Sequence, residues 1–255
     1  MLKRKISCKK QLQIGIWKGI RTCDFVWFDE ENSPRFCVIE NDISFERLKP
    51  NLLVGGCNYS LKTLKFVASI TSQYTWIKTL LLPHSLTISE YEQQCRFLLS
   101  QELPIIIDDI WFDYQVEQLK EGVKLTVYAV KKKIAEDYLK IYQPLSIQVL
   151  DCISNTVIRA FHYFIDYKIE KKSLFFYQDE VYVFIINPNT NQIQTIHKTK
   201  ISLTTLYEKF CQRYSFDCDQ VYYYSSLNNT QEYSPDWIRI DTDIPFIALG
   251  NALWK

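Results

Sequence analysis

The sequence predicts an α/β protein, and three observations lead to this class. Apolar and polar residues alternate from Ile110 to Val116 and from Leu125 to Val130, which predicts strands. Apolar residues lie three and four positions apart from Ser89 to Leu103 and from Ile134 to Tyr142, which predicts helices. A chain of 255 residues, 47% hydrophobic and 15% aromatic, can form one large or two small domains with a substantial core.

Charge and cysteine content narrow the class of protein. With 30 basic and 29 acidic residues, the net charge of +1 argues against a dominant surface for nucleic acid. The 8 cysteines lack Cys-x-x-Cys spacing, so we interpret them as reduced, partly buried thiols and not as a disulfide framework. No window reaches the roughly 18 apolar residues of a membrane span. We therefore expect a cytoplasmic protein. Its basic start, Lys3 to Lys10, is expected to be a solvated tail, with contact to anionic lipid as the alternative.

The N-terminal part of the chain reads mainly as strands. It opens with a predicted hairpin whose turn contains Lys18-Gly19. The expected elements are strands at 12–17, 23–28, 35–40, 52–54 and 74–82, a helical turn at 44–48 and a helix at 60–71. Gly55-Gly56 follows one of these strands and could cradle a phosphate, although a tight turn is the commoner meaning of such a pair.

The central part alternates helices and strands. Ser89 with Glu92 three residues later predicts a capping box at the start of the first helix. The turn Glu121-Gly122 joins the two alternating runs into an antiparallel hairpin. A strand beginning at Ile147 then feeds a helix over 155–165.

The C-terminal part repeats the strand-rich pattern. A hairpin is expected over 173–176 and 181–186, followed by a further strand beyond the turn at 187–191. The remaining expected elements are a helix at 203–214 and a strand at 221–226.

Several short motifs follow one another in a specific order. They are Leu82-Pro83, Leu103-Pro104, Asp113-Tyr114-Gln115, Ala129-Val130-Lys131-Lys132, Glu136-Asp137-Tyr138, Val149-Leu150-Asp151, Arg159-Ala160-Phe161 and the run from Pro245 to Trp254. In order and spacing the chain resembles the PilM family of type IV pilus assembly proteins, especially its competence-associated members in transformable gamma-proteobacteria. The resemblance implies an actin-like (ASKHA, FtsA/PilM-type) two-lobed α/β fold with a small inserted α+β subdomain. It implies a first lobe over 1–82, the insert over 83–144, and a second lobe over 145–255 whose C-terminal helix returns to the first.

The resemblance also locates the nucleotide-contacting loops of ATP-binding relatives, and all three depart from the pattern. A tryptophan stands where relatives carry the aspartate that organises Mg²⁺, no glycine lies between Gly122 and Gly250, and the third loop ends in two serines. The residues of this degenerate site are Trp17, Gly19, Ile20, Tyr177, Asp179, Ser225 and Ser226. We expect no ATP hydrolysis and no cofactor, with weak binding of ATP and Mg²⁺ as the alternative.

For a partner, the resemblance implies the N-terminal tail of a PilN-like (ComB-type) inner-membrane protein, bound in a cleft beside the insert. An extended peptide with apolar anchors suits such a cleft. The expected contact residues are Leu81, Leu82, Pro83, Trp111, Phe112 and Tyr114. Trp111 is the expected anchor; the alternative is a core tryptophan packed against the helix from Ser89. The partner would hold the protein at the inner membrane.

Other catalytic patterns carry little weight. The 3 histidines lack metal-ligand spacing, so we expect no metal site. Asp108-Asp109 is interpreted as a pair of loop carboxylates, and Lys131 to Lys133 as a solvated connection, with a nucleic-acid contact as the alternative. The sequence therefore predicts a non-enzymatic scaffold of pilus assembly and DNA uptake. The alternatives are an actin-like ATPase and a DNA-contacting competence factor.

Overall fold

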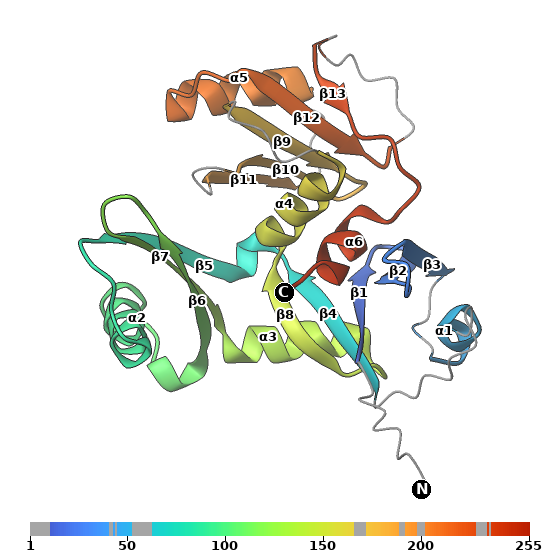
Figure 1. Ribbon diagram of the computed structural model, residues 1–255, viewed down its shortest axis with the longest axis horizontal. Helices are drawn as coiled ribbons and strands as arrows, with labels where there is room; N and C mark the ends of the chain where they lie inside the picture. The colour runs from blue at the N-terminus through green and yellow to red at the C-terminus, as the bar shows by residue number, and fades with distance from the viewer. Residues whose placement is uncertain are drawn as a thin grey trace, which may run out of the picture. The chain divides into compact units, whose positions relative to one another are not determined.

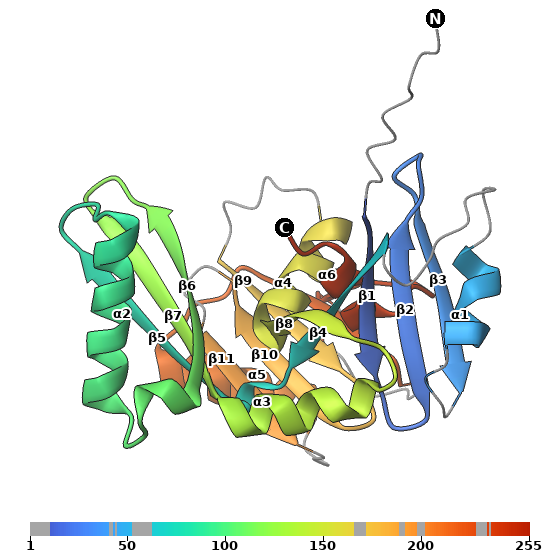
Figure 2. The same cartoon turned by 90° about the horizontal axis from the view of Figure 1, so that it is seen from below.

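The chain forms two compact units in a computed structural model, Met1–Ser69 with Pro144–Lys255, and Ile70–Gln143 (Figures 1 and 2). The structure describes residues 11–40, 43, 45–52, 63–165, 172–188, 192–197, 202–227, 234 and 236–255. The basic start and Gly55-Gly56 lie outside the described residues.

The first unit contains a five-stranded sheet built around the predicted N-terminal hairpin. Its strands are β1 (Leu12–Lys18), β2 (Thr22–Phe28), β3 (Pro34–Glu40), β4 (Leu64–Ile70) and β8 (Ile147–Cys152), in the order β3-β2-β1-β4-β8. β2 is antiparallel to β1 and β3, whereas β4 is parallel to β1. Helix α1 (Phe45–Leu52) contacts β3.

A second sheet of the same unit repeats this arrangement. Its strands are β9 (Ser173–Gln178), β10 (Tyr182–Asn187), β11 (Gln192–His197), β12 (Gln220–Ser225) and β13 (Ile238–Arg239), in the order β11-β10-β9-β12-β13. β10 is antiparallel to β9 and β11, and β12 is parallel to β9. Each sheet is therefore an antiparallel three-strand meander whose first strand gains a parallel neighbour, so the unit has two pseudo-equivalent halves.

Two helices, α4 (Ile153–Phe164) and α6 (Phe246–Ala252), lie between the two sheets (Figure 1). They share one core with inward-facing residues of β1, β2, β9 and β10. The other face of the second sheet packs on α5 (Leu203–Tyr214). Because β9 is buried on both faces, its middle residues Leu-Phe-Phe-Tyr form a continuous apolar and aromatic run rather than an alternating one.

Glycines allow α6 to approach its neighbours closely. A Cβ atom at Gly15 would overlap the Ala248 carbonyl oxygen and the Ala252 nitrogen, so β1 and α6 meet backbone to backbone. A Cβ atom at Gly250 would overlap the Thr156 carbonyl oxygen of α4. The closing helix is thus fixed between the first sheet and α4.

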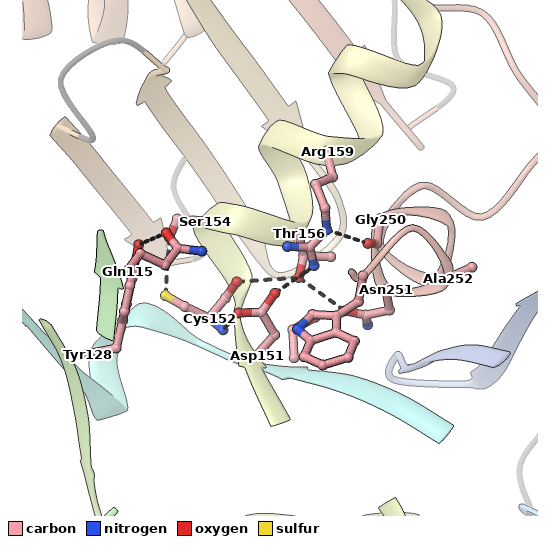
Figure 3. A network of polar contacts seen from close by, with 12 residues as sticks. Gln115, Tyr128, Asp151, Cys152, Ser154, Thr156, Arg159, Gly250, Asn251 and Ala252 are labelled. Atoms are coloured by element: carbon pink, nitrogen blue, oxygen red, sulfur yellow. Dashed lines mark hydrogen bonds and ion pairs between the residues drawn. The ribbon is translucent and has the colours of Figure 1, made fainter. Parts of the chain in front are cut away.

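A buried polar network joins the same elements (Figure 3). The side-chain oxygen of Asn251 accepts hydrogen bonds from Ser69 Oγ at 2.7 Å and Thr156 Oγ1 at 3.0 Å. Its amide nitrogen donates to the Ile16 carbonyl at 2.9 Å. Nearby, Arg159 donates to the Gly250 carbonyl at 2.9 Å and to Asp151 at 2.6 Å. These bonds satisfy polar groups of β1, β4, β8, α4 and α6.

The second unit is a three-stranded antiparallel sheet covered on one face by a helix. Its elements are β5 (Thr75–Leu82), α2 (Ile88–Glu102), β6 (Ile110–Gln118), β7 (Val123–Lys131), α3 (Lys132–Leu139) and short 3₁₀ turns at Ser72–Tyr74, Ile107–Asp109 and Lys140–Tyr142. The strand order is β5-β7-β6. The unit begins at Ile70, whereas the sequence analysis placed the start of the insert at Pro83. β5 belongs to this unit because all eight of its residues pair with β7.

Three local predictions were wrong. The expected helix at 60–71 is β4 over its described part, because its apolar residues are buried on both faces of a parallel strand and mimic helical spacing. The expected strand at 52–54 begins inside α1, which continues past Pro50 because Leu48 and Leu52 are buried one turn apart. The capping box of α2 uses Thr87 and Glu90 instead of Ser89 and Glu92.

Candidate functional site

Two places were predicted to carry function: the nucleotide position between the halves of the first unit, and a peptide cleft beside the insert. At the first, Trp17 is 7% exposed and belongs to the core around α4 and α6. In the following turn, the Gly19 amide donates to the Thr22 carbonyl at 2.9 Å, and a Cβ atom at Gly19 would meet only ordinary contacts. Ile20 is 65% exposed. The turn is therefore a plain hairpin connection that does not require glycine.

The second loop is closed by its own side chains. Asp179 Oδ1 accepts the amides of Val181 and Tyr182, each at 2.7 Å, and Asp179 Oδ2 accepts the Tyr177 hydroxyl at 2.8 Å. Burial and then the Asp179 carboxylate raise the pKa of Tyr177 well above its ordinary value, so the phenol stays protonated. The Asp179 carboxylate thus shapes the turn and holds a core tyrosine.

The third loop continues the sheet without a glycine cradle. Ser225 Oγ donates to the Gln178 side-chain oxygen at 3.1 Å, and the Ser226 amide donates to the Gln178 carbonyl at 3.0 Å. The predicted residues Tyr177 and Ser225 therefore lie on neighbouring strands of one sheet, and Asp179 and Ser226 follow the ends of these strands. Trp17 joins Tyr177 in the same apolar core, whereas Ile20 points to solvent.

Aromatic rings that the sequence analysis missed complete this region. Tyr224 stacks on Phe246 with centroids 4.3 Å apart, and Tyr177 stacks on Tyr224 at 5.7 Å. Burial, followed by the charges of Asp24 and Asp179, raises the pKa of Tyr224 to about 12. Burial also raises the pKa of the Asp24 carboxyl, and the Thr22 side chain partly offsets this. A lone aspartate inside the apolar strand 22–28 was the available signal for Asp24.

These residues do not fit a nucleotide–magnesium complex. Packed rings stand at the loop ends, and Asp24 and Asp179 place carboxylates beside them, which would repel phosphate oxygens. The described residues also contain no group of three or more His, Cys, Asp or Glu side chains that could hold a metal ion. The chemistry available here is packing and hydrogen bonding.

The second unit has a groove of about 250 Å³ at one end of its sheet. It opens between the start of β5, the 103–110 connection, the end of β7 and the start of α3. Its lining is mainly apolar, with Tyr74, Trp76, Ile105, Val130 and Ile134 among the contributing residues. Exposed Lys131 brings a positive charge to it. Ligand pockets for whole small molecules are generally about 300–1,000 Å³, so this groove suits one or two apolar side chains of a peptide.

The six predicted partner-contact residues do not come together. Trp111 pairs with groove residue Val130, whereas Leu81 pairs with Lys124. Lys124 lies six residues before Val130 in β7, which separates the two along the strand by about 20 Å. Leu82 packs against the core under α2, and Pro83 follows it beside Gly122 at the β6–β7 turn. The groove end and the turn end of the sheet are thus separate places.

Successive residues of β6 point to opposite faces of this sheet. Phe112 and Tyr114 pack against the core under α2, and the Arg96 guanidinium lies 5.2 Å from the Phe112 ring centre. Trp111 is 39% exposed on the face away from α2. The alternative placement of Trp111, against the helix from Ser89, is therefore wrong.

Comparisons with known proteins concern the fold. The chain is similar to the cytoplasmic domain of EpsL, an inner-membrane component of the type II secretion system of Vibrio cholerae, with TM-score 0.57, 12% identity and coverage of 95% of this chain and 94% of that one. It is also similar to a chain of the PilM–PilN type IV pilus biogenesis complex, with TM-score 0.59, 11% identity and coverage of 84% and 81%. Neither a family model nor a curated protein matches the sequence. The chain thus has the actin-like α/β fold of PilM-type proteins, as predicted. Among the described residues, none of the helices has the length and apolarity required to cross a membrane.

Proposed function

We propose that this protein is a cytoplasmic scaffold of a type IV pilus or competence pilus, with no enzymatic activity. One observation carries the proposal: the fold is that of PilM-type proteins, but the place of the nucleotide is packed with aromatic side chains and carboxylates. A protein that keeps the fold without room for phosphate groups can still present surfaces to partners. Among PilM-type proteins, the sequence motifs favour a role like that of ComA, in pilus assembly supporting DNA uptake.

The proposed partner is the N-terminal tail of a PilN-like (ComB-type) inner-membrane protein, which would hold the scaffold at the inner membrane. The PilM–PilN complex among the similar structures supports this choice. We place the tail at the groove of the second unit, where Tyr74 is 41% exposed and Trp111 is 39% exposed near the apolar lining. Aromatic residues of this kind commonly dominate binding energy. The tail would lay one or two apolar side chains into the groove.

A binding experiment tests this proposal. A synthetic peptide of the partner's N-terminal tail is titrated into the full chain and followed by calorimetry. Tyr74→Ala and Trp111→Ala should each weaken binding by about tenfold or more, as expected for aromatic anchors. The matched control is Leu81→Ala, which removes an apolar side chain that is 74% exposed at the turn end of the sheet. If Leu81→Ala weakens binding while both aromatic variants leave it unchanged, the groove is the wrong place. If no tail peptide binds, the partner is wrong.

A further inference from the structure

Strand β6 ends the sheet of the second unit. Its nine residues pair with β7, in the order β5-β7-β6, and among the described residues no strand pairs with its other edge. An edge strand presents a row of backbone N–H and C=O groups to any extended chain that approaches it. This edge begins beside the tail groove of the proposed function, at Trp111, and runs from there to the turn end of the sheet; the inference does not depend on that function.

The hairpin turn shows which backbone groups of β6 face outward. The Leu119 amide donates to the Gly122 carbonyl at 3.1 Å, which makes these two residues a hydrogen-bonded pair. Hydrogen-bonded and non-hydrogen-bonded pairs alternate along an antiparallel ladder. Counting back from Leu119, the residues Phe112, Tyr114 and Val116 belong to non-hydrogen-bonded pairs. Their amides therefore point away from β7. The Tyr114 amide donates to Asp113 Oδ1 at 2.8 Å, which agrees with this assignment.

The side chains of β6 define the kind of strand that would fit. On the α2 side, Phe112 and Tyr114 are partly buried and Val116 is 43% exposed, so an added strand could place apolar side chains beside them. On the opposite side lie exposed Trp111 at the start of the strand and then the exposed side chains of Asp113, Gln115 and Glu117. This alternation asks for a partner strand that is apolar on one face and polar on the other.

The charge along this strand is mainly negative, with exposed Lys131 opposite Ile110 at its start. Asp108 and Asp109 are exposed immediately before β6, and Asp113 is exposed within it. Lys124 pairs with Glu117 at 2.9 Å and neutralises only that carboxylate. Basic side chains on an added strand would therefore face carboxylates, and opposite charges across neighbouring strands are favourable. A second copy of β6 would instead bring acidic side chains toward acidic side chains, which argues against self-pairing.

We propose that the free edge of β6 binds an extended segment of another protein, as an added strand in which apolar and basic residues alternate. Main-chain hydrogen bonds to Phe112, Tyr114 and Val116 would supply much of the affinity. The basic side chains would select the partner through Asp113 and the acidic residues before the strand. The Tyr114 amide would exchange its Asp113 acceptor for a carbonyl of the added strand.

The test uses the full chain and a labelled nine-residue peptide of alternating valine and lysine, matched in length to β6. Fluorescence anisotropy should show binding that weakens with salt, and a valine–glutamate peptide should bind at least about tenfold more weakly. Val116→Pro removes an outward amide without removing a bond to β7, so it should abolish binding. Asp113→Asn keeps the side-chain oxygen that accepts the Tyr114 amide but loses the charge, so it should weaken binding several-fold. The groove variant Tyr74→Ala should leave this binding unchanged.

Three outcomes overturn the proposal: Val116→Pro binds the valine–lysine peptide like the parent, the valine–glutamate peptide binds equally well, or sedimentation shows a dimer of the parent that Val116→Pro dissolves. The last would make a second copy the occupant. If Val116→Pro fails to fold, a peptide N-methylated at the lysine amides and one N-methylated at the valine amides replace it. One of the two must lose binding, because one set of amides pairs with β6.

Discussion

At the scale of single residues, Asn251 is the side chain that links three buried polar groups of different elements. Its amide serves Ser69, Thr156 and the Ile16 carbonyl at once, from a position that is fully buried. Removing one partner of a buried hydrogen bond leaves the other group unsatisfied, which costs more than the bond itself contributes. The network therefore fixes the position of α6 against its neighbours and also stabilises the fold.

We predict that Asn251→Ala lowers the free energy of unfolding by about 2–5 kcal/mol, because it removes three buried hydrogen bonds at once. Urea unfolding followed by circular dichroism measures the loss. Asn51→Ala is the matched control, since Asn51 is exposed on α1 and its amide donates to the Arg47 carbonyl at 3.2 Å. The control should change stability by no more than about 0.5 kcal/mol. Equal effects of the two variants would contradict the role given to Asn251.

Asp24 gives a prediction about pH. Burial raises the pKa of its carboxyl in the folded protein, so the folded state binds the proton more tightly than the unfolded state. Stability attributable to Asp24 is therefore greatest below its unfolded pKa and is lost as pH rises through the folded pKa. We expect Asp24→Asn to be more stable than the parent at pH 7.

The size of that gain should depend on pH. It should shrink toward zero as pH falls below about 4, the ordinary range of an aspartate. Unfolding midpoints of both proteins between pH 3.5 and 8 check this. A gain that stays constant with pH would show that the amide acts through packing and not through the charge.

At the scale of elements, α6 is placed by backbone contact. Gly250 lies against the Thr156 carbonyl of α4, where a methyl group would force the two helices apart. Gly19, in contrast, sits in an open turn where a Cβ atom is at least 3.5 Å from its neighbours. The two glycines thus make a matched pair of alanine substitutions in one protein.

We predict that Gly250→Ala destabilises the fold by about 2 kcal/mol or more, because the overlap involves backbone atoms that cannot move aside cheaply. Gly19→Ala should be neutral or stabilising by up to about 1 kcal/mol, since it restricts the unfolded chain at a compatible position. Thermal unfolding of both variants measures the two changes in stability. A large loss at Gly19 would mean that the first loop still needs a glycine, as a phosphate-binding turn does.

The elements that the sequence predicted well are those with a local signal. Alternating apolar and polar residues and a glycine-containing turn predicted the β1–β2 and β6–β7 hairpins. In the second hairpin Gly122 has φ +92°, a backbone conformation that favours glycine. The α5 helix was found at 203–214 from its 3.6-residue periodicity. β4 was not, because a strand buried on both faces has no alternation to read.

The candidate sites show the same division. Trp17, Tyr177 and Ser225 lie at or near the ends of β1, β9 and β12, where a fold-level pattern led us to expect nucleotide-contacting loops. Phe246 and Tyr224 come from segments far apart in the sequence, and their stacking depends on tertiary packing that no local motif encodes. The partner-contact residues failed to converge for a related reason: Leu81 and Trp111 share a sheet face, but the register separates them.

At the scale of the whole molecule, the two halves of the first unit repeat one arrangement of strands. Each half of the first unit supplies a meander and a parallel strand, and the two helices between them form one continuous core. In an actin-like protein that binds ATP, the loop ends of both halves must leave space for phosphates and Mg²⁺. Here the rings of Tyr177, Tyr224 and Phe246 pack against one another on that side of the core, so aromatic contacts join the two halves.

We therefore predict that ATP with Mg²⁺ does not stabilise the protein. A ligand present at about 100 times its dissociation constant would add about 2.7 kcal/mol to the free energy of unfolding, which for a chain of this size raises the melting temperature by about 5 °C or more. We expect no shift in differential scanning calorimetry at millimolar nucleotide, and no phosphate release. An ATP-binding actin-like protein serves as the positive control. The contradicting result is a clear rise in the melting temperature of the parent with ATP and Mg²⁺, which Tyr177→Trp removes without changing the stability of the nucleotide-free protein. It would show that nucleotide enters this core. The scaffold proposal would then be wrong about the nucleotide position.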